Sequence, residues 1–290
     1  MLGVFFMFVL GLPLAYADKI KVVATISIIG DVVKNVADNA VDLALLVGPN
    51  SDAHEYEPTP QDSVNLAHAD IVFENGLHLE NWLDKLYIAS GSKAQRMVVS
   101  KGVIPRVFED SPQDEDPHAW QDVTNVIIYA QNVRDALVSI DPDHKDLYEA
   151  NANNYIQKLQ ALDKWVREQV ATIPADKRKL VTNHDALGYF ARAYGFKIIG
   201  AVIPSSTTEA ADPSARQTAD LLNIIKANGV LAIFSENMAN PKLAQTLSKE
   251  AGVRVGPQLY TDALGLAGSE GETYLKMIRC NVEAFLKYLK

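Results

Sequence analysis

Short apolar runs rich in Val, Ile and Leu alternate with segments of helical spacing along this chain of 290 residues. The runs predict strands at 20–27, 42–47, 71–74, 97–99, 179–182, 198–203, 231–235 and 253–255. Between them the spacing predicts helices, among others at 30–37, 60–67, 81–89, 123–138, 185–194, 215–227 and 241–251. Strands that alternate with helices form parallel sheets covered on both faces. The fold class is therefore α/β, and four strands before residue 110 with four after residue 178 predict two similar lobes.

Between the two groups of strands, residues 143–173 contain no Gly or Pro and are bounded by Pro142 and Pro174. Their apolar residues recur at helical spacing, at Leu147, Tyr148, Tyr155, Leu159, Leu162, Val166 and Val170. At 1.5 Å per residue such a helix is roughly 40 Å long. We expect one stiff helix that joins the lobes; the alternative is an ordinary surface helix inside one continuous domain.

The first 17 residues carry no charge and end in Ala15-Tyr16-Ala17. An apolar run of about a dozen residues before A-x-A is typical of a secretory signal peptide and is shorter than a membrane span. An uncleaved anchor or a buried first strand is the alternative, since no basic residue opens the run. We expect a signal peptide, an N-terminal lobe, a linking helix and a C-terminal lobe, at 1–17, 18–141, 142–174 and 175–290.

Cys280 is the single cysteine of the chain, so no intrachain disulfide can form. No cysteine stands at the end of the leader to accept a lipid. We therefore expect an exported protein that is periplasmic and not lipidated.

Composition excludes some classes of function. The chain has 27 Lys and Arg against 36 Asp and Glu, a formal net charge of −9, and no basic block, so nucleic acid is not an expected partner. A phosphate-binding loop, G-x-S-x-G and H-E-x-x-H are also missing from the sequence. We expect a protein that is not an enzyme.

Three of the six histidines share a setting. His54 lies in D-A-H-E-Y, past the strand predicted at 42–47, and His118 lies in D-P-H-A-W, which repeats that local pattern. His184 lies in T-N-H-D, past the strand predicted at 179–182. Open α/β sheets bind ligands beyond the carboxyl ends of their strands. Neutral imidazole is a good ligand for zinc and also suits manganese, iron, copper and nickel, so these residues predict a metal site.

A carboxylate commonly completes a site of three imidazoles. Asp262, in Y-T-D-A-L-G, is the preferred candidate, and Glu236, in S-E-N after the strand predicted at 231–235, is the competing one. Each residue also has a plainer interpretation. A lone loop histidine is usually solvated or bonded to a carbonyl, and Asp262 can instead cap a helix that begins near Ala263. His78 is left outside the site.

Six motifs stand in order along the chain: DAHEYEPTPQD (52–62), ENGLHLENWL (74–83), DPHAW (116–120), TNHDALGYFARAYGF (182–196), FSEN (234–237) and LYTDALG (259–265). Together they resemble the metal-binding lipoprotein or adhesin family, the substrate-binding components of ABC importers for zinc and manganese. The resemblance covers essentially the whole chain after the leader.

The resemblance implies two lobes, each a four-stranded parallel sheet flanked by helices, joined by one long rigid backbone helix. It places the metal ligands at His54, His118, His184 and Asp262, with Zn²⁺ or Mn²⁺ held between the lobes. The implied function is capture of that ion in the periplasm and delivery to the membrane permease of an ABC importer, by a protein we expect to be a monomer. Asp52, Asp116 and Asp185 are expected to orient the imidazole rings.

Two features depart from the family. Zinc-dedicated members often carry a His-rich acidic loop before the second ligand, whereas residues 109–115 are acidic without histidine. Many members are lipidated at the end of the leader, which this chain cannot be. Cell adhesion is a property attached to some members and has no residue signature here.

Two other functions remain open at this stage. A binding protein for an organic or siderophore-type solute could use the same architecture, with Arg and aromatic residues lining its cleft. A zinc hydrolase would need an open coordination position and a nearby base.

Overall fold

The computed structural model describes residues 19–108, 111–203 and 214–290. The predicted leader, residues 1–17, lies outside the described residues. Within the described part of the chain, no helix combines the length and the apolar character needed to cross a membrane.

The first half of the chain forms one parallel sheet in the order β2-β1-β3-β4. Strand and helix alternate as predicted, in the elements β1 (Ile20–Ile26), α1 (Ser27–Ala37), β2 (Val41–Val47), α2 (Pro60–His68), β3 (Ile71–Glu74), α3 (Leu83–Ser90) and β4 (Gln95–Val98). Neighbouring residues of β1 face opposite sides of the sheet: Val22 and Ala24 join the apolar cluster of α1, whereas Val23 joins the cluster with α2 and α3. Both faces of the sheet are therefore covered by helices, as expected.

The second half contains β5 (Lys179–Thr182), α6 (Gly188–Tyr194), β6 (Lys197–Ala201), α7 (Ala215–Asn228), β7 (Ala232–Ile233), α8 (Lys242–Ala251), β8 (Arg254–Val255) and α9 (Tyr274–Tyr288). β5 pairs with β6 and β7 pairs with β8, all parallel. The two pairs form separate two-stranded sheets, linked by a hydrogen bond from the Phe234 backbone N–H to the Val181 carbonyl at 3.0 Å. This half is less regular than the first, because β7 and β8 have two residues each and a register shift interrupts the β5–β6 pairing.

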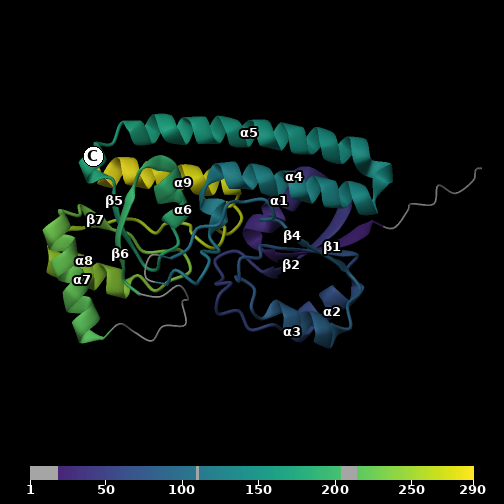
Figure 1. The fold of residues 1–290 in the computed structure, drawn as a ribbon, viewed down its shortest axis with the longest axis horizontal. Helices are drawn as coiled ribbons and strands as arrows, with labels where there is room; N and C mark the ends of the chain where they lie inside the picture. The colour runs from purple at the N-terminus through teal and green to yellow at the C-terminus, as the bar shows by residue number, and fades with distance from the viewer. Residues whose placement is uncertain (1–18, 109–110, 204–213) are drawn as a thin grey trace, which may run out of the picture.

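The predicted long helix is α5 (Lys145–Ala171), which follows α4 (Val123–Ile140) and has 27 residues. It runs along one side of the whole molecule (Figure 1) and contacts α1 and α4 of the first half and α6 and α9 of the second. Six of the seven residues of the predicted apolar stripe are buried, together with Ala152. The prediction was wrong for Leu147, which is 38% exposed.

The two halves are also joined where the end of the chain returns. Figure 1 shows α9 lying beside α5. The Tyr274 N–H at the start of α9 donates to Asp31 of α1 at 3.1 Å, and the Leu264 N–H donates to Ser27 at 3.0 Å. The Asn50 N–H in turn donates to the Leu264 carbonyl at 2.9 Å. The loop before α9 is therefore hydrogen-bonded to the first half of the chain. These bonds favour small movements of the two halves relative to each other over wide opening.

Candidate metal centre

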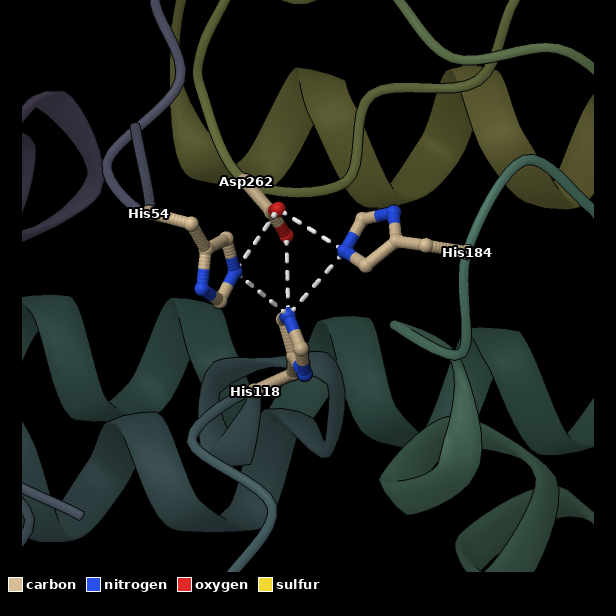
Figure 2. A group of neighbouring side chains, drawn as sticks. All are labelled: His54, His118, His184 and Asp262. Carbon is tan, nitrogen blue, oxygen red and sulfur yellow. Dashed lines mark hydrogen bonds and ion pairs between the residues drawn. The ribbon is translucent and has the colours of Figure 1, made fainter. Parts of the chain in front are cut away.

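Three imidazoles and one carboxylate meet between the two halves of the chain (Figure 2). The Nε2 atom of His118 lies 3.1 Å from Nε2 of His54 and 3.2 Å from Nε2 of His184. Asp262 Oδ2 lies 3.4 Å from His54 Nε2 and 3.0 Å from His184 Nε2, while Oδ1 lies 3.5 Å from His118 Nε2. One ligand atom from each residue lies within 4.8 Å of the other three. The structure thus brings all four predicted site residues together.

The spacing of these atoms matches what a small divalent ion requires. Zinc binds imidazole nitrogen at about 2.0–2.1 Å, so neighbouring ligands of a tetrahedral site are ~3.3 Å apart. Five of the six residue pairs in the group have ligand atoms 3.0–3.5 Å apart, and the His54–His184 pair lies within the 4.8 Å limit. Both carboxylate oxygens of Asp262 are buried and face the imidazoles of the same group. A buried carboxylate needs a cation or a hydrogen-bond donor beside it, so this donor set fits a metal ion.

The group is nearly closed to solvent. His118, His184 and Asp262 are at most 1% exposed, and the side chain of His54 is 5% exposed. His54 lines a cavity of about 710 Å³, and His184 lines a second of about 590 Å³. Glu55 contributes to both. Two of the four side chains in the group therefore each border a cavity.

The four predicted ligands come from loops of different kinds. His54 lies in the loop after β2, and His184 lies two residues beyond the end of β5, as the rule on strand ends predicts. His118 instead follows β4 at a distance and immediately precedes a short 3₁₀ turn, Ala119–Gln121, that leads into α4. Asp262 lies in the loop between β8 and α9. No helix begins near Ala263, so the reading of Asp262 as a helix cap was wrong.

The repeated D-x-H pattern corresponds to a repeated turn. Asp52 accepts the backbone N–H of His54 at 2.8 Å, and Asp116 accepts the backbone N–H of His118 at 3.0 Å. Asp side chains that bond the backbone two residues on stabilise such turns. The same local chemistry therefore presents the first two imidazoles.

Two of the rings are held from behind by carboxylates. Asp116 lies 2.7 Å from Nδ1 of His118, as predicted. Glu236 lies 2.6 Å from Nδ1 of His184 and also accepts the His184 backbone N–H at 2.9 Å. Such partners fix the tautomer that points Nε2 at a metal. Glu236, the competing ligand candidate, thus lies behind the predicted ligand His184 rather than among the group of four.

The other two predicted ring partners were wrong. Asp52 accepts a hydrogen bond from the backbone of His54 rather than from its ring, and Asp185 pairs with Arg106. In both cases the carboxylate satisfies a nearer donor, backbone for Asp52 and guanidinium for Asp185. His78 lines the larger cavity but is outside the four-residue group.

The charges in the cluster reinforce one another. Burial alone would lower the pKa of His118, but the carboxylates of Asp262 and Asp116 outweigh it and raise that pKa to about 9. Burial would also lower the pKa of His184, but the carboxylates of Glu236 and Asp262 outweigh this effect. The pKa of His184 therefore lies well above its ordinary value. Burial would raise the pKa of Asp262, yet the imidazoles of His184 and His118 hold it well below its usual range. Without metal, the group is therefore a set of buried ion pairs.

Contacts that the sequence did not reveal hold the Asp262 loop. The side-chain N–H groups of Trp120 and Gln121 both donate to the Thr261 carbonyl at 2.7 Å. The Thr261 hydroxyl donates to Glu236 at 2.9 Å. Thr261, the residue before Asp262, is thus bonded both to the segment that follows His118 and to Glu236. These residues are far apart in the sequence, so only the fold brings them together.

Comparison with known proteins agrees with this geometry. The family model described as "Zinc-uptake complex component A periplasmic" matches residues 22–288. The chain is 38% identical over 272 residues to the manganese-binding lipoprotein MntA of Halalkalibacterium halodurans, covering 94% of this chain and 89% of that protein. It is 35% identical over 277 residues to the iron-binding protein YfeA of Yersinia pestis, covering 95% and 88%. Among solved structures, the periplasmic zinc-binding protein TroA from Treponema pallidum matches with a TM-score of 0.87 and 33% identity, over 93% of this chain and 99% of that one.

Proposed function

Since the chain belongs to the family of periplasmic zinc-uptake components, whose members are substrate-binding proteins of metal transporters, we propose that it captures one divalent transition-metal ion and delivers it to the permease of an ABC importer. The observation that carries the proposal is the convergence of His54, His118, His184 and Asp262 on one buried point. In this proposal the ion is the cargo. It exchanges its water for three imidazoles and a carboxylate, and the closed surroundings slow its release.

Zinc or manganese is the proposed ion. Three imidazoles suit zinc, which accepts four ligands in tetrahedral geometry. Both oxygens of Asp262 face the imidazoles of the group, so a fifth coordination position is available for manganese, which prefers more oxygen ligands. Relatives named for manganese, iron and zinc support a site of this general class.

We propose that the protein works as a monomer in the periplasm and is not lipidated. Proteins of this family act outside the cytoplasm, and several relatives are named lipoproteins. Here Cys280 is the single cysteine, and it lies within α9, far along the chain from the predicted leader. The division into two lobes and a linking helix, at the boundaries given above, is part of the same proposal.

Binding rather than catalysis is the proposed role. Four side chains fill the tetrahedral positions of a zinc ion, whereas a catalytic zinc keeps one position open for water. Tyr56, Trp82 and Phe108 line the larger cavity, but the described lining of the two cavities also includes imidazoles and carboxylates and includes no arginine, which the organic-solute alternative requires. An organic or siderophore-type solute is therefore not favoured.

Calorimetric titration of demetallated protein with zinc and with manganese tests the proposal. We expect one ion per chain, and we expect His118→Ala to lose binding of both ions. His68→Ala is the matched control, because His68 is exposed on α2 and its ring bonds the Val64 carbonyl. Binding in the His118→Ala variant as tight as in the parent protein would contradict the proposal.

A further inference from the structure

One arginine touches the loops of two predicted ligands. The Arg106 guanidinium donates from Nη1 to Asp116, the carboxylate behind His118. From Nη2 it reaches Asp185, the residue after His184, at 3.3 Å. Arg106 precedes α5 in the chain and Asp185 follows it, so this one side chain links ligand loops from both halves. The Arg106 side chain is 14% exposed, and Asp116 is fully buried.

The start of α6 is shaped to receive this guanidinium. A Cβ atom at Gly188 would lie 2.0 Å from Arg106 Nη1, so the guanidinium occupies the space that any other residue would fill. The Arg106 backbone N–H donates to the Tyr189 hydroxyl at 2.9 Å, and that hydroxyl donates to the Asp116 carbonyl at 3.1 Å. Gly188 and Tyr189 thus hold both ends of Arg106 in place.

We infer that Arg106 is a positioning residue that sets how long the metal stays bound. This inference rests on the proposed function. Arg106 holds the Asp116 side chain in place, Asp116 lies against Nδ1 of His118, and the opposite ring nitrogen, Nε2, therefore keeps its direction toward the predicted metal position. By binding Asp185 as well, the same guanidinium fixes the distance between the His118 and His184 loops.

Charge and position can be separated experimentally. Arg106 repels a bound cation, but it also neutralises two carboxylates that would otherwise repel each other. Replacing Arg106 changes both the charge and the link. Gly188→Ala changes neither charge nor ligand, and displaces only the end of a flexible side chain. An effect of this variant on metal release therefore reports the position of Arg106.

The experiment measures zinc dissociation from the loaded full-length protein into excess chelator. Partners behind metal ligands typically change metal affinity about 10–100-fold. We expect Gly188→Ala and Arg106→Gln each to speed release about tenfold, and to alter the visible absorption spectrum of the Co²⁺-loaded protein. Gly48→Ala and Arg216→Gln are the controls. A Cβ at Gly48 meets no atom within 4 Å, and Arg216 is exposed on α7, where it pairs with Asp220 of the same helix.

The double variant gives the decisive result. If Gly188 acts through Arg106, then Gly188→Ala should change release less than twofold once Arg106→Gln is present. An equal effect of Gly188→Ala with and without Arg106, or no effect of either single variant on a parent that binds zinc, would overturn the inference. A parent protein that binds no zinc would overturn the proposed function itself. If Arg106→Gln does not fold, the release rate of Gly188→Ala alone tests the inference, and an unchanged rate overturns it.

Discussion

The Nε2 atoms of His118 and His184 lie 3.2 Å apart although the residues are separated by 66 positions, and the Nδ1 atom of each ring lies against a carboxylate oxygen. With Nδ1 protonated toward Asp116 and Glu236, both Nε2 atoms can present lone pairs to one point. Two lone pairs at this distance repel unless a proton or a metal ion lies between them. The arrangement is therefore complete only when a cation occupies that point.

The two carboxylates of the C-terminal half should have separable roles. Asp262→Asn removes a charged ligand and should weaken zinc binding by more than about a hundredfold, beyond the range typical of partners behind a ligand. Glu236→Gln loosens the orientation of His184 and should cost about 10–100-fold. Isothermal titration of both variants checks this order. A larger loss for Glu236→Gln than for Asp262→Asn would mean that Glu236 is the ligand.

Metal binding should release protons. Below its pKa of about 9, His118 carries a proton in the metal-free protein, and it must lose that proton from Nε2 to bind metal. The apparent zinc affinity should therefore rise with pH up to about 9. Below that pH, each unit of acidification should weaken the affinity by up to about tenfold for each proton displaced.

Zinc titration at pH 7 in two buffers of different ionisation enthalpy counts these protons. We expect release of at least one proton per ion. Asp116→Asn removes the charge of a carboxylate that raises the pKa of His118, so this variant should release fewer protons on binding zinc. No net release by the parent protein would contradict the protonation assigned to the metal-free site.

Glu80 should make the protein less stable as pH rises. Its side chain is buried, and burial raises its pKa to about 7 despite hydrogen bonds from Thr25 and Asn75 that lower it. Between about pH 4.5 and 7 the folded protein keeps this proton when the unfolded chain has lost it, so the free energy of unfolding falls through that window by about 3 kcal/mol.

Denaturant unfolding with a chelator present, at pH 5 and pH 8, measures this change. Glu80→Gln should lose less stability between the two pH values than the parent. Glu250→Gln, which changes an exposed residue of α8, should behave like the parent. Equal losses in all three proteins would rule out Glu80 as the source.

Zinc should raise the thermal stability of the protein only through the four-residue site. Ligand that binds only the folded state, at 100 times its dissociation constant, adds about 2.7 kcal/mol. We expect zinc to raise the Tm of the parent, and a chelator to reverse the shift. Thermal unfolding of His184→Ala should show no such shift, while His144→Ala, which alters an exposed imidazole beside Asp141, should keep it. A zinc-dependent shift in His184→Ala would point to a second site.

Local pattern was sufficient to predict much of the fold. The stripe in 143–173 predicted α5 because a run without Gly or Pro, with apolar residues at helical spacing, has few other folded states. The strands at 71–74 and 179–182 were found at their observed bounds, since short β-branched runs between turn residues are distinctive. Strand 231–235 shortened to Ala232–Ile233, because strand length depends on neighbours that sequence does not specify.

Long-range packing set the limits of prediction at the site. His54 and His184 follow strands, and this placement was visible in the sequence. Nothing local indicated that Glu236 would lie behind His184, or that Arg106 would take Asp185, because those contacts join loops from distant parts of the fold. A carboxylate at a strand end can be recognised as a candidate, but its role depends on which donor the fold places nearest.

The most direct test of the central claim is a crystal structure of the zinc-loaded protein, with anomalous scattering recorded on both sides of the zinc absorption edge. The account predicts one strong zinc peak per chain, within about 2.0–2.2 Å of Nε2 of His54, His118 and His184 and of an Asp262 oxygen. A zinc peak at another group of residues, with these three imidazoles bound to none, would contradict it.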